Sequence, residues 1–293
     1  MTRKIFSPFD SLLAELRRPL REIPLATYPE FTGCTRADVH DGLQGQGGLF
    51  LASDMAKTLR LAPGMRIMDL GSGRGATAVF LARKYGVRVF AVDEYKPDSV
   101  FERSGARELS DLIAPVRADA RQLPFAEGFF DRIFCMNAHF YFATDDLYPP
   151  YILKFLKPDG EMVIGGPCYR DELTADTPEE FLLEFPACLA VHSPLWWKRH
   201  FERSKEAVVI ASELHPRGVE FWEDRVKFLL ETEDCSTMPK GRLGMIRDIL
   251  RMLLRDHDGF VSHFILHLRK GAPDKLSLPT PANVTPPSAT AGR

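Results

Sequence analysis

Short apolar runs recur at intervals through the middle of the chain, and polar or glycine-containing segments separate them. Runs over 65–70, 87–93, 114–119, 131–137 and 157–166 have the length and the β-branched content of buried strands. Apolar residues at helical spacing fill several of the intervals. Because βαβ units place strands side by side and cover both faces with helices, this alternation predicts an α/β fold with a parallel sheet.

The flanks of this region have different patterns. Apolar positions near helical spacing over 8–23 and 49–59 predict two helices, with a loop-rich segment between them. After the fifth strand, the pattern predicts helices over 193–204, 218–231 and 243–256 and strands over 207–214 and 259–270. The tail, 271–293, is rich in Pro, Thr, Ala and Ser, and we expect it to be disordered.

Composition narrows the functional class. The 293 residues are 45% apolar and 27% charged, with a net charge of −2, which is typical of a globular domain and not of a basic nucleic-acid-binding protein. No apolar run approaches the ~18 residues of a membrane-spanning helix. The N-terminus also lacks the long uncharged core of a signal peptide. We therefore expect a cytoplasmic protein with no nucleic-acid or membrane partner.

Cysteine and histidine spacings give no support to a metal site. The five cysteines are scattered without a CxxC pair, and the eight histidines include no HExxH pattern. We expect free thiols rather than disulfides, and no bound metal.

The most informative stretch is DLGSGRGA, over 69–76, which follows the first predicted strand and opens the next helix. Its glycines fit a dinucleotide loop or another nucleotide-binding loop. Asp69 separates these alternatives by charge. Its carboxylate would repel a pyrophosphate near the helix N-terminus by an energy on the order of several kcal/mol at ~4 Å. The same carboxylate would favour a cofactor with a cationic amino group and a sulfonium, such as S-adenosylmethionine (SAM).

Two further acids end the next predicted strands. Asp93 can accept both hydroxyls of an adenosine ribose, which does not distinguish NAD from SAM. Asp119 can accept the exocyclic amine of adenine, and the backbone amide of Ala120 can donate to a ring nitrogen. The alternative for each acid is a cap or a solvated loop position.

DLGSGRG, the acid of VDEY, ADARQLPF and LKPDGEMVIGG occur in this order, and together they resemble a class I SAM-dependent methyltransferase over 62–167. The resemblance implies a Rossmann-like seven-stranded sheet, mostly parallel with an antiparallel last strand, and helices on both faces. It also implies an N-terminal helical cap over 1–60. A SAM-binding methyltransferase domain would follow over 61–270, with a lid insert over 168–193.

The same resemblance implies the cofactor contacts. They are Asp69, Gly71, Ser72, Gly73 and Gly75 for the methionine moiety, Asp93 and Glu94 for the ribose, Asp119 and Ala120 for adenine, and Asn137 on the methionine and substrate side. Phosphoethanolamine- and glycine-type methyltransferases also carry a Gly-Gly pair over the methionine part, which Gly47 and Gly48 resemble. The alternative for this pair is a flexible hinge.

Substrate chemistry is expected after the fourth strand, in AHFYF. His139 is the general-base candidate because its ordinary pKa lies near neutrality, and Tyr141 is placed to orient an acceptor. Both can instead pack against the following helix or cap it. The candidate substrate contacts from the lid and the cap are Tyr28, His192, Trp196 and Trp197. A core position is the alternative for the tryptophans and for the cap tyrosine.

The sequence thus predicts an enzyme that moves a methyl group from SAM to nitrogen or oxygen of a small molecule and releases S-adenosylhomocysteine, with a slight preference for nitrogen. Two other classes stay open: an NAD-dependent oxidoreductase that uses the same glycine loop, and a non-catalytic SAM-binding regulator. A small-molecule substrate is the expected partner, and the chain is expected to be a monomer or a homodimer. The identity of the acceptor does not follow from the fold.

Overall fold

The computed structural model describes most of the chain. The described residues are 8–16, 18–40, 45–95, 97–102, 106–177, 190–255 and 259–271. The predicted disordered tail beyond Gly271 and part of the predicted lid, 178–189, lie outside the described residues.

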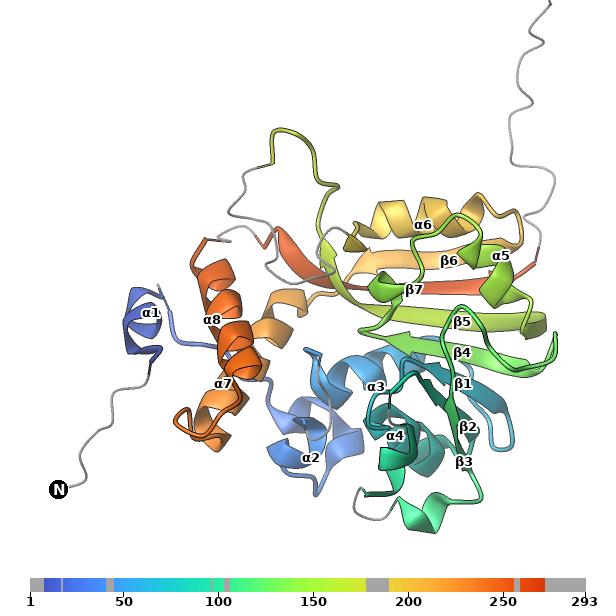
Figure 1. Ribbon diagram of the computed structural model, residues 1–293, viewed down its shortest axis with the longest axis horizontal. Coiled ribbons are helices and arrows are strands. Elements are labelled where there is room, and N and C mark those ends of the chain that lie inside the picture. The colour runs from blue at the N-terminus through green and yellow to red at the C-terminus, as the bar shows by residue number, and fades with distance from the viewer. Residues whose placement is uncertain are drawn as a thin grey trace, which may run out of the picture.

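A seven-stranded sheet forms the centre of the molecule (Figure 1). Its strands are β1 (Arg66–Leu70), β2 (Arg88–Asp93), β3 (Ile113–Arg117), β4 (Phe130–Met136), β5 (Leu156–Tyr169), β6 (Ala207–Leu214) and β7 (Val261–Lys270). Their order across the sheet is β3-β2-β1-β4-β5-β7-β6. The first five strands run parallel, and β7 pairs antiparallel with both β5 and β6. The predicted mostly parallel sheet with an antiparallel last strand is confirmed.

Helices cover both faces of this sheet, as predicted. The α-helices are α1 (Asp10–Glu15), α2 (Arg36–His40), α3 (Gly48–Thr58), α4 (Ala76–Tyr85), α5 (Tyr148–Leu153), α6 (Pro194–Glu202), α7 (Gly218–Thr232) and α8 (Lys240–Arg255). Short 3₁₀ turns are η1 (Leu25–Thr27), η2 (Pro29–Phe31), η3 (Pro97–Glu102), η4 (Arg107–Leu109) and η5 (His139–Tyr141). Among the described residues, no helix has the length and apolarity to cross a bilayer.

Alternation along the strands divides the core between the two faces. Ile67 of β1 packs in a cluster with residues of α3 and α4, whereas Met68 and Leu70 pack in a second cluster with residues of α5 and α6. A third cluster joins α1, α7 and α8 at the side of the sheet that Figure 1 shows on the left. Strands that are buried on both faces read as continuous apolar runs, which is why the sequence pattern located them closely.

Two predicted helices differ from the structure. The helix predicted over 8–23 spans only Asp10–Glu15, because Pro19 has no backbone N–H and pushes the preceding residue towards an extended conformation. In the interval after β2, where the alternation of the sheet region predicts a helix, the described residues form the 3₁₀ turns η3 and η4. Serine and aspartate within that stretch compete for backbone hydrogen bonds and favour turns over a continuous helix.

A pair of buried acids attaches the segment before α2 to α7. We call Glu223 and Asp224 of α7 the cap anchor. Glu223 lies 2.5 Å from Arg18 and 2.6 Å from Arg21, and Asp224 lies 2.9 Å from Arg36. These ion pairs join residues about 200 positions apart and therefore set where the N-terminal cap stands against the sheet.

Candidate functional site

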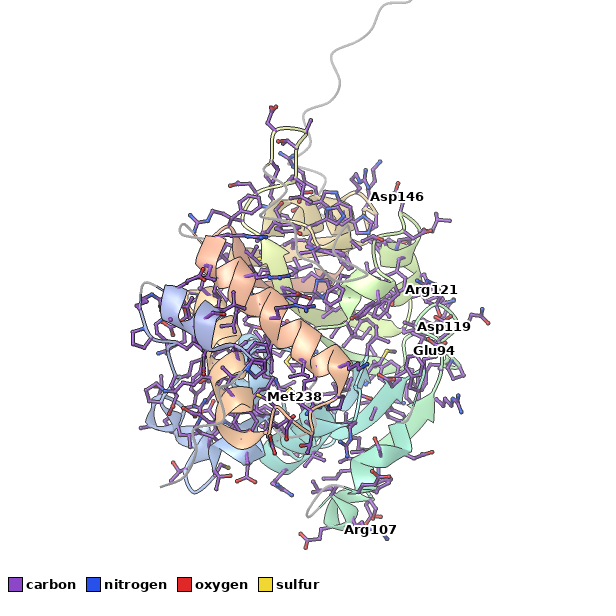
Figure 2. All side chains as sticks on the ribbon, turned by 60° about the vertical axis from the view of Figure 1, so that its left-hand side comes forward. Glu94, Arg107, Asp119, Arg121, Asp146 and Met238 are labelled. Atoms are coloured by element: carbon purple, nitrogen blue, oxygen red, sulfur yellow. The ribbon has the colours of Figure 1, made fainter. Side chains whose placement is uncertain are left out.

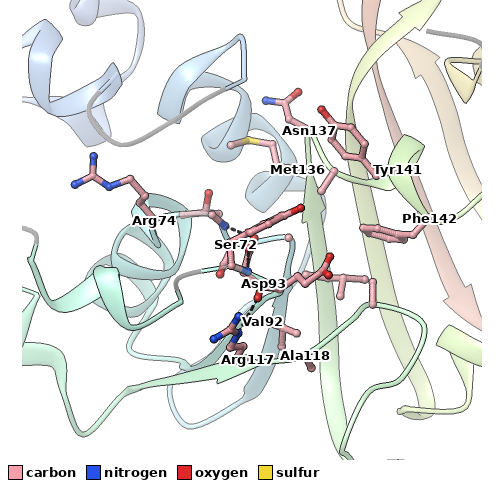
Figure 3. A pocket seen from close by; sticks show the side chains of 18 of the residues that line it. Ser72, Arg74, Val92, Asp93, Arg117, Ala118, Met136, Asn137, Tyr141 and Phe142 are labelled. Carbon is pink, nitrogen blue, oxygen red and sulfur yellow. Dashed lines mark hydrogen bonds between the residues drawn. The ribbon is translucent and has the colours of Figure 1, made fainter. Parts of the chain in front are cut away.

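A cavity of about 1120 Å³ opens at the carboxyl ends of β1, β2, β3 and β4 (Figure 3). It lies where the chain order reverses on the two sides of β1, which is the point at which a parallel sheet leaves a crevice between neighbouring loops. Most small-molecule pockets measure ~300–1,000 Å³. The cavity therefore has room for a nucleotide-sized cofactor together with a second small molecule.

The glycine loop after β1 forms one wall. The N–H groups of Gly71 and Ser72 donate to the carbonyl of Val92 at 2.9 and 3.0 Å, which ties the loop to β2. Gly71 has a φ of +75°, and a Cβ at this position would lie 2.3 Å from the Cβ of Ala138, so the turn requires glycine. Gly73 also lines the cavity, whereas Gly75 lies behind this wall, at the start of α4.

Asp69 is the penultimate residue of β1 and lies beneath this loop, and it is not among the residues that line the cavity, which corrects the predicted direct cofactor contact. It is 2% exposed, and one carboxyl oxygen has no hydrogen-bond partner among the described residues. Burial raises the pKa of Asp69 to about 8; the charge of Asp93 adds to the rise, and the backbone N–H of Ala78 opposes it. A cation bound above the loop would offset the cost of ionising this carboxyl, and a pyrophosphate would add to it. The buried acid therefore fits a positively charged cofactor.

Asp93 ends β2 and joins the glycine loop to the strand. Its carboxylate accepts the N–H of Gly73 at 2.8 Å and the N–H of Tyr95 at 3.0 Å. The dashed bond in Figure 3 shows how this side chain reaches the loop from the cavity wall. A carboxylate has about four lone-pair positions, so two remain for ribose hydroxyls.

The segment after β3 forms the end of the cavity opposite Asn137. Asp119 and Ala120 line it, as predicted for an adenine subsite, and Asp119 accepts the N–H of Arg121 at 2.8 Å. Glu94 lines it as well, and Figure 2 shows Glu94, Asp119 and Arg121 at the same edge of the molecule. The adenine and ribose candidates are therefore brought together.

The segment after β4 completes the cavity. Asn137 has a φ of +56°, its backbone N–H donates to the carbonyl of Gly165 at 2.8 Å, and its side chain lines the cavity. Tyr141 in η5 is 60% exposed and also lines it, and its carbonyl accepts from Arg121 at 2.9 Å. These residues lie beside the glycine loop, where the methionine side of a cofactor would meet an acceptor.

The placement of His139 corrects the expectation that it acts as a general base. Its ring is fully buried, with ring centroids of Trp197 and Phe264 at 4.9 and 5.3 Å, and it is not among the residues that line the cavity. Burial, aided by the charge of His192, lowers the pKa of His139 to about 3. An imidazole enclosed by aromatic rings has no direct contact with a substrate in the cavity.

The tentative substrate contacts are also away from the cavity walls. Tyr28 is buried in the cap and donates to Asp54 at 2.5 Å, so it packs in the core and does not close over the site. Trp197 lies on the buried face of α6, which also makes it a core residue. His192 stacks on Trp196 with ring centroids 3.8 Å apart, and neither residue is among those that line the cavity in the described part of the chain.

The glycines over 45–48 are arranged differently from the prediction. Gly47 and Gly48 begin α3 and contact Leu51 and His40, and Gly45 is the loop glycine that lines the cavity. The glycine of this segment that lines the cavity is therefore two residues closer to the N-terminus than the predicted Gly47.

Sequence reasoning missed several residues of the cavity wall. They are Gly45, Arg74, Tyr95, Ser99, Glu102, Arg117, Arg121 and Phe142. Tyr95 and Arg121 each follow a predicted acid by two residues, and this spacing was the available signal. The others depend on how loops from separate strands meet.

The order of the strands, the glycine loop after β1 and the acids at the ends of the next strands define a Rossmann-like nucleotide-binding domain of the class I methyltransferase type. Residues 67–160 match the family described as a methyltransferase domain. The match runs from β1 into β5 and so includes the glycine loop and the acids after β2 and β3.

One curated relative and two solved structures are similar to this chain over larger parts of its length. The glycine/sarcosine/dimethylglycine N-methyltransferase of Actinopolyspora halophila is 28% identical over 143 residues, which is 46% of this chain and 25% of that protein. The structure of phosphoethanolamine N-methyltransferase 2 of Haemonchus contortus, in complex with SAM, aligns with a TM-score of 0.66 at 15% identity and covers 86% of this chain and 60% of that one.

The second structure is that of the [4+2]-cyclase SpnF. It aligns with a TM-score of 0.64 at 18% identity and covers 88% of this chain and all of that one (100%). The chain spans about half or less of the length of the curated relatives that match it first. These likenesses establish the fold, while the activity of the whole protein depends on the site.

Proposed function

We propose that the protein is a SAM-dependent methyltransferase that transfers the methyl group to nitrogen or oxygen of a small molecule and releases S-adenosylhomocysteine. The observation that carries the proposal is the buried Asp69 beneath the glycine loop, with one oxygen unpartnered and a pKa raised to about 8. A cavity that keeps such an acid behind an open nucleotide loop favours a cationic cofactor over NAD.

Residues at the ends of three strands, β1, β2 and β3, would hold this cofactor. Gly71, Ser72 and Gly73 would contact the methionine moiety, with Asp69 supplying the compensating negative charge beneath them. Asp93 would accept the ribose hydroxyls. In the same arrangement Glu94, Asp119 and Ala120 surround the ribose and adenine end. In this proposal the methionine, ribose and adenine parts of SAM would contact the segments after β1, β2 and β3 in turn.

The end of the cavity at Asn137 and Tyr141 would receive the acceptor. Bound SAM supplies an activated methyl group, so the protein mainly has to position a lone pair in line with it. The Tyr141 hydroxyl is the exposed group at this end that can orient an amine or a hydroxyl. The proton that leaves the acceptor would pass to water, to which this 60% exposed tyrosine is open.

A small amine is the preferred acceptor, and a hydroxyl is the second candidate. Support comes from the activities of two similar proteins, an N-methyltransferase of glycine, sarcosine and dimethylglycine and one of phosphoethanolamine. A cytoplasmic location and a monomeric or homodimeric state belong to the same proposal, together with a small-molecule rather than a nucleic-acid or membrane partner.

Equilibrium titration with SAM, S-adenosylhomocysteine and NAD tests the cofactor. We expect both adenosyl compounds to bind and NAD not to bind. Asp93→Ala should lower the affinity for both adenosyl compounds by about tenfold, as loss of hydrogen bonds to a charged group would. Binding of NAD without SAM would replace this proposal by an NAD-dependent oxidoreductase.

Methyl transfer needs a separate measurement, because the fold is shared with a protein solved as a [4+2]-cyclase. Incubation with methyl-labelled SAM and a panel of small amines and alcohols should give labelled product. Binding of SAM with no transfer to any member, in parallel with active control enzymes, would favour the non-catalytic SAM-binding regulator.

A further inference from the structure

Two adjacent residues after β4 each fit against a different glycine of the cavity wall. Ala138 contacts Gly71 of the glycine loop, where an added Cβ would lie 2.3 Å from the alanine Cβ. Asn137 contacts Gly45 of the cap loop, where an added Cβ would lie 2.4 to 2.7 Å from three side-chain atoms of the asparagine. The turn after β4 is therefore in contact with both glycine segments at once.

A hydrogen bond strengthens the contact on the cap side. The Asn137 carboxamide donates through Nδ2 to the backbone carbonyl of Gln46 at 2.9 Å. The two residues are 91 positions apart, so this bond joins the segment before α3 to the end of β4. After Gln46, the chain enters α3, most of whose residues are buried in the core. We call 45–48 the cap loop.

The backbone at Asn137 suits this role. Its φ of +56° is a left-handed conformation that most side chains avoid and that asparagine tolerates better than most. The conformation is kept because the backbone N–H is bonded to Gly165 and the side chain to the cap loop. Non-glycine residues in this region cluster at functional sites, where the surrounding structure holds them.

We infer that Asn137 is a positioning residue that holds the cap loop at the mouth of the cavity, with Gly45 as its required partner. Together with the Ala138–Gly71 contact, it sets the separation between the two glycine segments that border the methionine end. The inference rests on the proposed function for what the cavity binds. The contact of Asn137 with the cap loop, which we call the latch, is present in the ligand-free protein.

The first experiment uses the full chain without ligand. Hydrogen exchange, measured by mass spectrometry on the peptides that carry the cap loop, should be faster in Asn137→Gly than in wild type. Glycine retains the left-handed backbone and removes the carboxamide, so the fold should be kept. Gln46→Ala is the matched control, because it retains the carbonyl that accepts the bond, and its exchange should equal that of wild type.

The second experiment measures S-adenosylhomocysteine affinity. We expect Asn137→Gly to weaken it by about tenfold, the effect of losing the hydrogen bond to the cap loop. Gly45→Ala should weaken it by a similar factor, because the added Cβ would displace the Asn137 side chain. Gln46→Ala should bind as wild type does. Thermal unfolding of each variant shows whether a loss of affinity reflects the loop or the whole fold.

The outcomes separate the two proposals. Unchanged exchange of the cap loop in Asn137→Gly overturns the latch, whatever the protein binds. Faster exchange with unchanged affinity overturns the claim that the latch serves the cavity. If wild type binds no adenosyl compound while Asn137→Gly still loosens the cap loop, the proposed function fails and the latch stands.

Discussion

Replacing Asp69 by asparagine tests the electrostatic argument on which the proposed cofactor depends. The carboxyl is 2% exposed, and its pKa is raised to about 8 by burial and by the neighbouring charge of Asp93. In the ligand-free protein the group is therefore mostly protonated at neutral pH. A cationic cofactor favours the ionised form, so binding should release a proton and tighten as the pH rises.

The magnitude follows from the titration curve. A carboxyl with a pKa of about 8 is ionised in about one molecule in a hundred at pH 6 and in about half of the molecules at pH 8. If only the ionised form binds the cation well, the affinity for SAM rises roughly 50-fold between these two values. Asp69→Asn keeps the shape of the side chain and removes the titration, so its affinity should be nearly constant over this range.

The stability of the ligand-free protein gives an independent readout. Because the folded-state pKa lies above the unfolded value, the folded protein holds a proton that the unfolded chain has released between about pH 4 and pH 8. Stability therefore falls as the pH rises through this window, by at most about 1.4 kcal/mol per unit from this group. Asp69→Asn should flatten that fall.

Calorimetric titration at pH 6, 7 and 8 in buffers of different ionisation enthalpy measures affinity and proton release together. Glu102→Gln is the matched control, since this cavity acid has a side chain that is 70% exposed, and it should keep the pH dependence of wild type. An affinity that does not change with pH in wild type, or a dependence that persists in Asp69→Asn, would refute the reasoning.

Three further predictions concern the cap and the acceptor end. Asp224→Ala should lower the free energy of unfolding, measured by urea denaturation, by about 3–5 kcal/mol, because it leaves the buried partners of this 1% exposed carboxylate without a compensating charge. Glu220→Gln at the surface should lower it by less than about 1 kcal/mol, and equal effects of the two substitutions would contradict the importance of burial. Tyr141→Phe should lower kcat about tenfold without changing S-adenosylhomocysteine affinity, and full turnover would remove its orienting role. His139→Phe should retain turnover in the labelled-methyl assay, and a large loss of turnover with the fold intact would restore His139 as a catalytic candidate. The variant should also lose less stability than wild type on acidification from pH 6.5 towards 3, because the pKa of the buried imidazole is lowered to about 3 and the unfolded chain accepts a proton that the folded wild type does not.

The strands were predictable because their information is local. A strand buried on both faces is a continuous apolar run, and β1, β2 and β4 begin and end within one residue of the predicted ranges. The edge strand β6 also matches its predicted range. The order of acids and glycines at the strand ends was equally local, because parallel strands bring their carboxyl ends to one edge of the sheet. Asp93, Asp119 and the glycine loop accordingly meet in one cavity.

Other features were not local. The pattern over 8–23 suggested one long helix, but Pro19 and the attachment of Arg18 and Arg21 to Glu223 produce a short helix and an extended segment. His139 has the sequence context of a general base, yet Trp197 and Phe264, far along the chain, enclose its ring. Burial of a side chain depends on elements that the local sequence does not contain.

By itself, then, the amino-acid sequence determined the α/β sheet, its covering helices and the nucleotide-binding edge, since periodicity, glycine and charge act over a few residues. Only the tertiary structure decided that Gly45 and not Gly47 faces the cavity, that Asn137 holds the cap loop, and that Asp69 is buried deeply enough to raise its pKa to about 8. These properties come from contacts between segments brought together by folding, and desolvation and close packing exist only once the chain is compact.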